Sequence, residues 1–107
     1  MLVEVFYCGR KHRTNAHGVY NPETNKLTVY KGSIVSESVR QFSQTSRIKE
    51  LREQYTDKNG LVLQDISLDS PSMAASFVTG YSIDGLSAWH IDKHKTLKDV
   101  RKCSTEQ

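Results

Sequence analysis

The sequence predicts an α+β fold, in which a small antiparallel sheet of about five or six strands is packed by two or three short helices in a single domain. Short stretches that alternate apolar and polar residues occupy the first third of the chain. Two stretches with helical spacing follow, and each begins with a residue that can cap a helix. The chain has 107 residues without repeats or linkers, so we assign residues 1–107 to one domain and expect residues 101–107 to fray.

The N-terminal third is expected to form three strands. An opening strand that contains Val3, Phe6 and Tyr7 is expected to end at Gly9, and further strands are expected over residues 18–20 and 26–31. The connecting sequence NPETN contains the Asn and Pro residues that favour turns. Leu27 and Val29 alternate with more polar neighbours, so one face of this strand can be buried. The last two strands should therefore pair as a hairpin.

A helix is predicted over residues 46–55, in the sequence SRIKELREQY. Ser46 is the expected N-cap, because its hydroxyl can accept a hydrogen bond from the first turn. Ile48, Leu51 and Tyr55 fall at helical spacing and form one apolar stripe. Charged residues occupy most of the other positions, so we expect the stripe to face the core and the charges to face the solvent.

The segment from Ser70 to Trp89 is expected to lie mostly in the core, because Asp84 is its only charged residue. Ser70 is a good N-cap, and Pro71 follows at the first helical position, where a missing N–H costs nothing. Gly80 stands where helices commonly end in the left-handed conformation. These signals predict a helix of about nine residues.

Two further strands and a last helix complete the predicted fold. Strands are expected over residues 61–63 and 86–91, the second after an Asp-Gly turn and with Trp89 as its largest apolar anchor. Thr96 is followed three residues later by an Asp, a spacing that fits a capping box. It predicts a short helix near the C-terminal end of the chain.

The distribution of charge leaves two interpretations open. The net charge is +3, but residues 61–85 contain three Asp and no Lys or Arg. The rest of the chain carries 15 Lys and Arg against nine acidic residues. Such an excess is consistent with a polyanionic partner and equally with an ordinary solvated surface.

The sequence also predicts a cytoplasmic protein without membrane association. No apolar run approaches the roughly 18 residues that span a bilayer. The N-terminal sequence MLVEVFYCGR lacks the basic leader of a signal peptide. Cys8 and Cys103 lie at opposite ends of the chain, and in a reducing compartment we expect both to be free thiols.

No recognised catalytic or cofactor motif is present in the sequence, so we expect no enzyme activity, no metal and no cofactor. His90 and His94 have the spacing of two zinc ligands, but neither Cys8 nor Cys103 has a second cysteine nearby to complete a site. His17 is expected to be an exposed loop residue, because no nucleophile or orienting group accompanies it. A small hydrolase or nuclease that uses His17 or His90 is a weaker alternative.

Basic residues gather in two short clusters, at residues 10–13 and 93–95, that could contact phosphates. If both clusters lie on one face, they would form a modest patch with aromatic residues nearby for stacking. The alternative is that both clusters are solvated turns. The candidate nucleic-acid-binding residues are Arg10, Lys11, Arg13, Lys31, Lys93, Lys95, Tyr81 and Trp89.

Four stretches of the chain resemble, in the same order, an uncharacterised bacterial family. They are AHGVYNPETNKLTVYKGS (residues 16–33), SPSMAASFVTG (70–80), DGLSAW (84–89) and KTL (95–97). That family is a domain of unknown function, often found C-terminal to GIY-YIG nucleases and in restriction-modification contexts. It is similar in style to the RAMA module, the restriction adenine methylase associated domain. The resemblance covers residues 3–100.

The resemblance implies a non-enzymatic accessory role in which DNA is the expected ligand. It also implies a separately encoded nuclease or restriction-modification protein as an expected partner. A protein-interaction or regulatory module, with a homodimer as one form, is the alternative. The family often has an aromatic residue after the Asn-Gly or Asp-Gly turn, where this chain has Leu86. A base contact made by that aromatic ring would be absent here, whereas a core role would tolerate the change.

Overall fold

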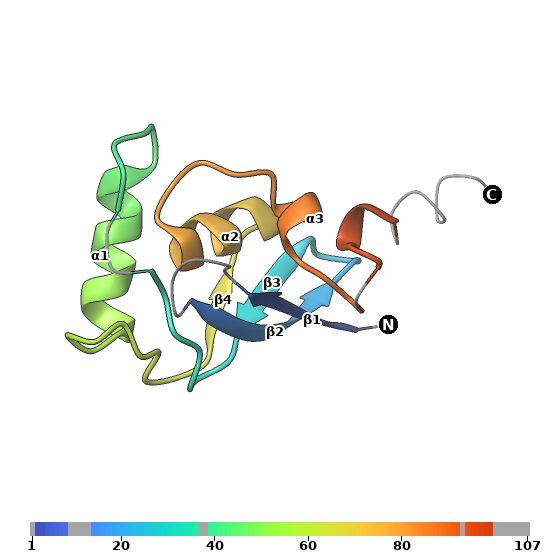
Figure 1. Ribbon diagram of the computed structural model, residues 1–107, viewed down its shortest axis with the longest axis horizontal. Helices are drawn as coiled ribbons and strands as arrows, with labels where there is room; N and C mark the ends of the chain where they lie inside the picture. The colour runs from blue at the N-terminus through green and yellow to red at the C-terminus, as the bar shows by residue number, and fades with distance from the viewer. Residues whose placement is uncertain (1, 9–13, 37–38, 93, 100–107) are drawn as a thin grey trace.

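A four-stranded antiparallel sheet lies at the centre of the computed structural model, which describes residues 2–8, 14–36, 39–92 and 94–99 (Figure 1). The strands follow one another across the sheet in the order β1-β2-β3-β4. They are β1 (Val3–Cys8), β2 (Asn15–Asn21), β3 (Lys26–Val29) and β4 (Ile66–Leu68). With the helices described below, the sheet confirms the predicted α+β fold, although it has fewer strands than expected.

The predicted hairpin is confirmed, and its first strand is longer than expected. β2 pairs with β1 along the whole length of β1, and it pairs with β3 next to the turn. Asn25 closes the turn with a φ of 62°, a left-handed conformation that Asn tolerates better than most residues. Its side-chain oxygen accepts a 2.7 Å hydrogen bond from the Tyr20 hydroxyl. This bond ties the turn to the buried side of the sheet, because Tyr20 itself is buried.

β4 is not among the predicted strands, and the strand predicted over residues 61–63 is wrong. Those residues form only isolated bridges, one from Leu61 and one from Val62. In β4 a single exposed residue, Ser67, separates two buried apolar residues. An alternation of three residues is too short to indicate a strand by itself. β4 forms because the free edge of β3 offers it backbone partners.

Helix α1 (Thr45–Tyr55) starts one residue before Ser46, so the prediction of Ser46 as N-cap is wrong. Instead, the Thr45 hydroxyl accepts a 2.6 Å hydrogen bond from the Phe42 N–H and donates a 2.8 Å bond to the Arg40 carbonyl. Thr45 is buried whereas Ser46 is exposed. The buried threonine therefore organises the turn that leads into the helix.

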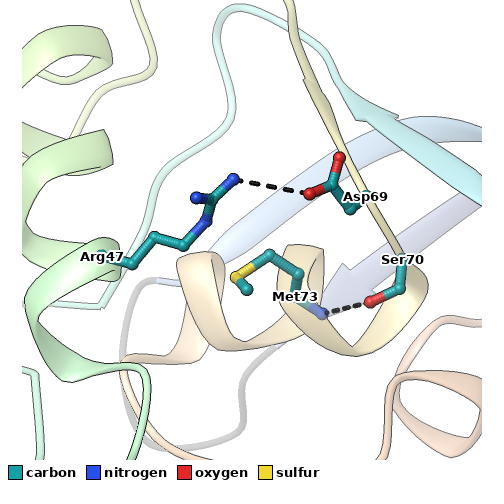
Figure 2. Close-up of polar contacts among 4 residues, drawn as sticks. All are labelled: Arg47, Asp69, Ser70 and Met73. Atoms are coloured by element: carbon teal, nitrogen blue, oxygen red, sulfur yellow. Dashed lines mark hydrogen bonds and ion pairs between the residues drawn. The ribbon is translucent and has the colours of Figure 1, made fainter.

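Helix α2 (Pro71–Thr79) confirms the predicted caps at both ends. The Ser70 hydroxyl accepts a 3.1 Å hydrogen bond from the Met73 N–H, as Figure 2 shows. Gly80 ends the helix with a φ of 84°, the left-handed conformation that glycine adopts without strain. The helix packs against β3 and β4, and its Phe77 side chain is fully buried.

Helix α3 (Gly85–Ala88) replaces the strand predicted over residues 86–91. The Asp84 carboxylate accepts hydrogen bonds from the Leu86 N–H at 3.2 Å and from the Ser87 hydroxyl at 2.9 Å. The Asp-Gly pair therefore caps and begins a helix, although the same pair is also typical of hairpin turns. This double use of one dipeptide explains why the prediction was wrong.

The start of α3 packs directly onto the start of α2. A Cβ atom on Gly85 would lie 2.1 Å from the carbonyl carbon of Pro71, so only glycine allows this approach. Trp89 follows α3, and its indole N–H donates a 3.1 Å hydrogen bond to the Pro71 carbonyl oxygen. Its side chain is fully buried. Trp89 is thus an anchor of the core, as expected, but it is not in a strand.

The last described segment forms a helical turn over residues 97–99. The Asp99 carboxylate accepts a 2.9 Å hydrogen bond from the Thr96 N–H, which is one of the two bonds of the predicted capping box. Leu97 is fully buried. The predicted tail over residues 101–107 lies outside the described residues. Within the described ranges, no helix is both long enough and apolar enough to cross a membrane.

The two faces of the sheet differ in what lies against them. Alternation along the strands places Val5, Ala16 and Leu27 on one face, where all three are buried. We call this the covered face, because α2 packs against it and α3 packs on α2; helix α1 lies at one end of the long axis (Figure 1). Glu4 and His17 point the other way and are exposed. We call their side of the sheet the open face.

Candidate functional site on the open face of the sheet

The predicted nucleic-acid-binding residues do not form one patch among the residues that the structure describes. Arg10, Lys11, Arg13 and Lys93 lie outside the described residues. Of the others, Lys31 and Lys95 are exposed, Tyr81 is half-buried and Trp89 is buried.

Trp89 has no accessible surface to offer a ligand. Its side chain is 0% exposed. The Tyr7 ring meets it edge-on, with the two ring centroids 6.3 Å apart. The indole N–H is already bonded to a backbone carbonyl, as described above. We therefore correct the prediction that placed Trp89 near a recognition surface.

Tyr81 lies next to the C-terminal end of α2, on the helical side of the molecule. The guanidinium carbon of Arg40 lies 5.2 Å from the centroid of the Tyr81 ring, in a cation–π arrangement. The Arg40 N–H donates a 2.6 Å hydrogen bond to the Gly80 carbonyl. Tyr81 therefore helps to hold the segment before α1 against the end of α2, and it lies away from the open face.

Four ring-bearing residues lie side by side across the open face. Phe6 on β1 is directly opposite His17 on β2, and the Tyr30 N–H donates a 2.8 Å hydrogen bond to the His17 carbonyl. On the other side of β1, Phe6 and His90 exchange two backbone hydrogen bonds of 2.9 Å each. The order across the sheet is therefore His90, Phe6, His17, Tyr30, and we call this set the ring row.

The ring row borders a hollow in the surface. Phe6, His17 and Tyr30 line a cavity of about 410 Å³ together with Glu4, Val5, Gly18 and Ile91. Among the four rings, the His17 side chain is exposed and the others are half-buried. The Phe6 and His90 rings already stack, with centroids 5.7 Å apart and planes inclined by 28°. The hollow thus presents partly exposed flat rings around an open space.

The charges near the ring row are of both signs. Lys31 follows Tyr30 at one end, and its N–H donates a 2.9 Å hydrogen bond to the Asp65 carboxylate. At the other end, the Lys95 carbonyl accepts a 2.9 Å bond from the Ile91 N–H. Glu4 lines the hollow itself. The two predicted lysines that the structure describes therefore lie at opposite ends of the row, with carboxylates between and beside them.

The turn that carries Lys95 is held by Asp92. Its carboxylate accepts hydrogen bonds from the backbone N–H groups of His94 at 2.8 Å and Lys95 at 3.0 Å. The bond from His94, followed by that from Lys95, lowers the pKa of the Asp92 carboxyl below its ordinary value of 3.8. Asp92 is therefore ionised at neutral pH, and it fixes the path of the chain beside the ring row.

A second hollow, of about 660 Å³, lies between α1 and the turn at residues 57–60. Arg52 lines this hollow, but its guanidinium is already hydrogen-bonded to the protein backbone. It donates hydrogen bonds to the carbonyl oxygens of Ser36 at 2.8 Å, Phe77 at 3.0 Å and Val78 at 3.2 Å. Burial lowers the pKa of Arg52 to about 10, so it stays protonated at neutral pH and stabilises the carbonyl end of α2.

Among the described residues, no group of three or more His, Cys, Asp or Glu side chains gathers as metal ligands would. His90 stacks on Phe6, while His94 is exposed on the turn. Cys103 lies outside the described residues. His17 is exposed, as expected, but it lies in β2 rather than in a loop.

The ring row is the feature that sequence reasoning missed. The only signal for it is the phase of the alternation, because Phe6 falls between two residues of the covered face, Val5 and Tyr7. That phase becomes visible only once the pairing register joins Phe6 to His17 and Tyr30. Leu86, which follows the Asp-Gly pair, is half-buried in α3 and does not line the hollow.

Comparison with known proteins yields one match. A family model described as "Domain of unknown function (DUF4357)" matches residues 6–101. No curated protein and no solved structure is found to match the chain. The matched range contains β1 from Phe6 onward, all of the other strands and helices, and every member of the ring row.

Proposed function

This chain belongs to the DUF4357 family, a domain of unknown function, and we propose that it is a non-enzymatic domain that binds nucleic acid, DNA in the first place, through the open face of its sheet. The observation that carries this proposal is the ring row, which lies on the face that no described helix covers. Aromatic and imidazole rings on an exposed sheet are a recurrent means of binding bases by stacking.

The composition of the chain makes these rings unusual for an ordinary surface. Residues of this protein are charged in 25% of positions and aromatic in only 8%. Two of its eight tyrosine and phenylalanine rings nevertheless line one hollow together with His17, and His90 stacks on one of them, Phe6. Lys31 and Lys95, at the two ends of the row, would contact separate phosphates of a strand that lies along the row.

The setting of this activity is part of the proposal. The resemblance described above supports an accessory role beside a DNA-processing enzyme. We propose a separately encoded nuclease or restriction-modification protein as the partner, and a cytoplasmic location. Arg10, Lys11 and Arg13 follow β1 in the sequence, and their contribution to phosphate binding stays a prediction.

The proposal can be tested by fluorescence anisotropy with labelled DNA at low and near-physiological salt. The wild-type chain should bind DNA. The double variant Lys31→Gln, Lys95→Gln should bind severalfold more weakly, because each substitution removes one phosphate contact. The matched control is Lys49→Gln, Lys58→Gln, which removes two exposed lysines at the second hollow. This control variant has the same net charge as the first double variant, but it should bind DNA as tightly as the wild type does.

Two results would contradict the proposal. If no DNA binds at low salt, the open face is not a nucleic-acid interface. A concentration-dependent dimer in sedimentation would then favour the protein-interaction module instead. If the two double variants lose affinity equally, binding depends only on net charge and the ring row is not the site.

A further inference from the structure

We infer that the open face accepts unpaired strands, with bases stacked on the ring row, in preference to a duplex. This inference rests on the proposed nucleic-acid-binding function and adds the class of ligand. It follows from three observations: the spacing of the rings, the recessed position of the row and the mixed charge around it.

The spacing of the ring row suits a strand laid across the sheet. Neighbouring strands lie about 4.8 Å apart, so the backbone positions of Phe6, His17 and Tyr30 together span about 10 Å. His90 extends the row beyond β1. A single strand that crosses β1, β2 and the end of β3 therefore meets one ring after another. Each base has a flat face that such a ring can contact, whatever the sequence.

The stacked pair within the row shows the geometry that a base would adopt. Phe6 and His90 stack with their planes inclined by 28° and their centroids 5.7 Å apart. Among the described residues, neither His17 nor Tyr30 has a ring partner of this kind. A base that enters the hollow can therefore continue the stack on these two rings. The hollow of about 410 Å³ lies within the range of sites that hold small flat ligands.

A duplex fits this surface poorly. Its bases are reached through a groove, which requires a protruding helix or two-stranded ribbon. The ring row is instead recessed, at the wall of a hollow. Phosphate contacts alone cannot compensate, because Glu4 lies in the hollow and Asp65 and Asp92 lie beside the two lysines. An unpaired strand can turn its bases toward the rings and keep most of its phosphates in the solvent.

The affinity for a single strand should depend only weakly on salt, because few phosphates are contacted. For single strands, the logarithm of the binding constant falls with the logarithm of salt by about 0.7 per phosphate contact. Lys31 and Lys95 would give a slope of about −1.4. Binding led by stacking should therefore persist at near-physiological salt, whereas binding led by phosphates would fall steeply.

The experiment compares three labelled 15-nucleotide ligands by anisotropy: single-stranded DNA, RNA of the same sequence, and the matching DNA duplex. We expect single-stranded DNA to bind at least tenfold more tightly than the duplex. The comparison with RNA shows whether the protein binds single strands of both DNA and RNA. The wild-type chain should also show perturbed His17 and His90 ring proton resonances when the single strand is added.

Ring variants locate the binding surface. Phe6→Leu and Tyr30→Leu each remove a ring but keep an apolar side chain, and each should weaken single-strand binding by about 5- to 100-fold. Tyr81→Leu removes a ring from the helical side and should leave the affinity unchanged. Thermal unfolding identifies any variant that no longer folds, and Tyr30→Leu is the more conservative test because Tyr30 follows the end of β3.

The outcomes separate this inference from the proposed function. Equal or tighter binding of the duplex, with Phe6→Leu and Tyr30→Leu unaffected, would overturn the single-strand inference but leave nucleic-acid binding in place. Failure of all three ligands to bind at low salt would overturn both.

Discussion

Trp89 and His90 are neighbours in the sequence, yet they lie on opposite sides of the sheet. Trp89 is buried on the covered face, where its indole N–H is bonded and the Tyr7 ring packs against it. His90 lies half-buried on the open face and stacks on Phe6. Both faces thus carry rings, but only those of the covered face are fully accounted for by packing. This difference indicates that the covered face contributes stability, and it makes the open face the candidate for the proposed ligand binding.

The largest expected effect separates the two neighbours directly. Trp89→Ala should lower the free energy of unfolding by about 3–5 kcal/mol, because it opens a cavity and leaves the Pro71 carbonyl without its indole partner. His90→Ala should cost less than about 1 kcal/mol, because its side chain is partly solvated. Urea denaturation of both variants measures the difference. Equal losses of stability would remove the distinction between the faces.

The contact between α2 and α3 gives the next largest effect. Gly85→Ala places a Cβ against the backbone of Pro71, so the two helices must separate, at a cost of about 1–3 kcal/mol. The control is Gly32→Ala, which meets nothing within 4 Å and suffers only from its φ of 91°. We expect about 1 kcal/mol for the control. Thermal unfolding should rank Gly85→Ala as the less stable variant, and the reverse order would contradict the close packing.

A smaller effect is expected on the open face. Glu4→Gln removes a negative charge from the hollow and should tighten single-stranded DNA binding by up to about fivefold at low salt, without a change in unfolding. The gain should shrink as salt is raised, because the charge is exposed. Glu53→Gln, on the exposed side of α1, is the matched control for net charge. A gain of equal size in both variants would contradict a specific role for the hollow.

The smallest effect concerns the turn beside the ring row. The folded-state pKa of Asp92 lies below its ordinary value, so its stabilising effect is complete above pH 3.8 and is lost as the pH falls through the lowered pKa. The amide proton shifts of His94 and Lys95 should follow this titration in nuclear magnetic resonance spectra. Shifts that stay constant across that range would show that the carboxylate does not hold the turn.

The parts of the fold that the sequence predicted depend on local signals. The caps of α2 were predictable because Ser70 bonds within its own first turn and Gly80 needs only its own backbone conformation. The hairpin was predictable for the same reason, because its turn residues act within five positions of the chain. Local chemistry of this kind can be recognised without knowing what lies nearby.

The errors arose where distant parts of the chain decide the structure. Asp84 can begin either a turn or a helix, and the approach of Gly85 to Pro71 favours the helix. The sequence pattern predicts Arg52 to be an exposed charge on α1, but its guanidinium donates hydrogen bonds to two carbonyl oxygens at the end of α2. The ring row depends on strand register, which relates Phe6 to His17 and Tyr30 across gaps in the sequence. Of the predicted site residues that the structure describes, Lys31 and Lys95 lie beside the ring row, whereas Tyr81 and Trp89 do not.

The burial of Trp89 gives the protein an intrinsic optical reporter of one face. It is the single tryptophan in the chain, and its indole lies in the core, away from the hollow on the open face. Its emission should therefore shift when the covered face opens to water and should stay nearly constant when a ligand occupies the ring row. Unfolding and binding can thus be followed in one sample, by tryptophan emission and by the label on the nucleic acid, without interfering with each other.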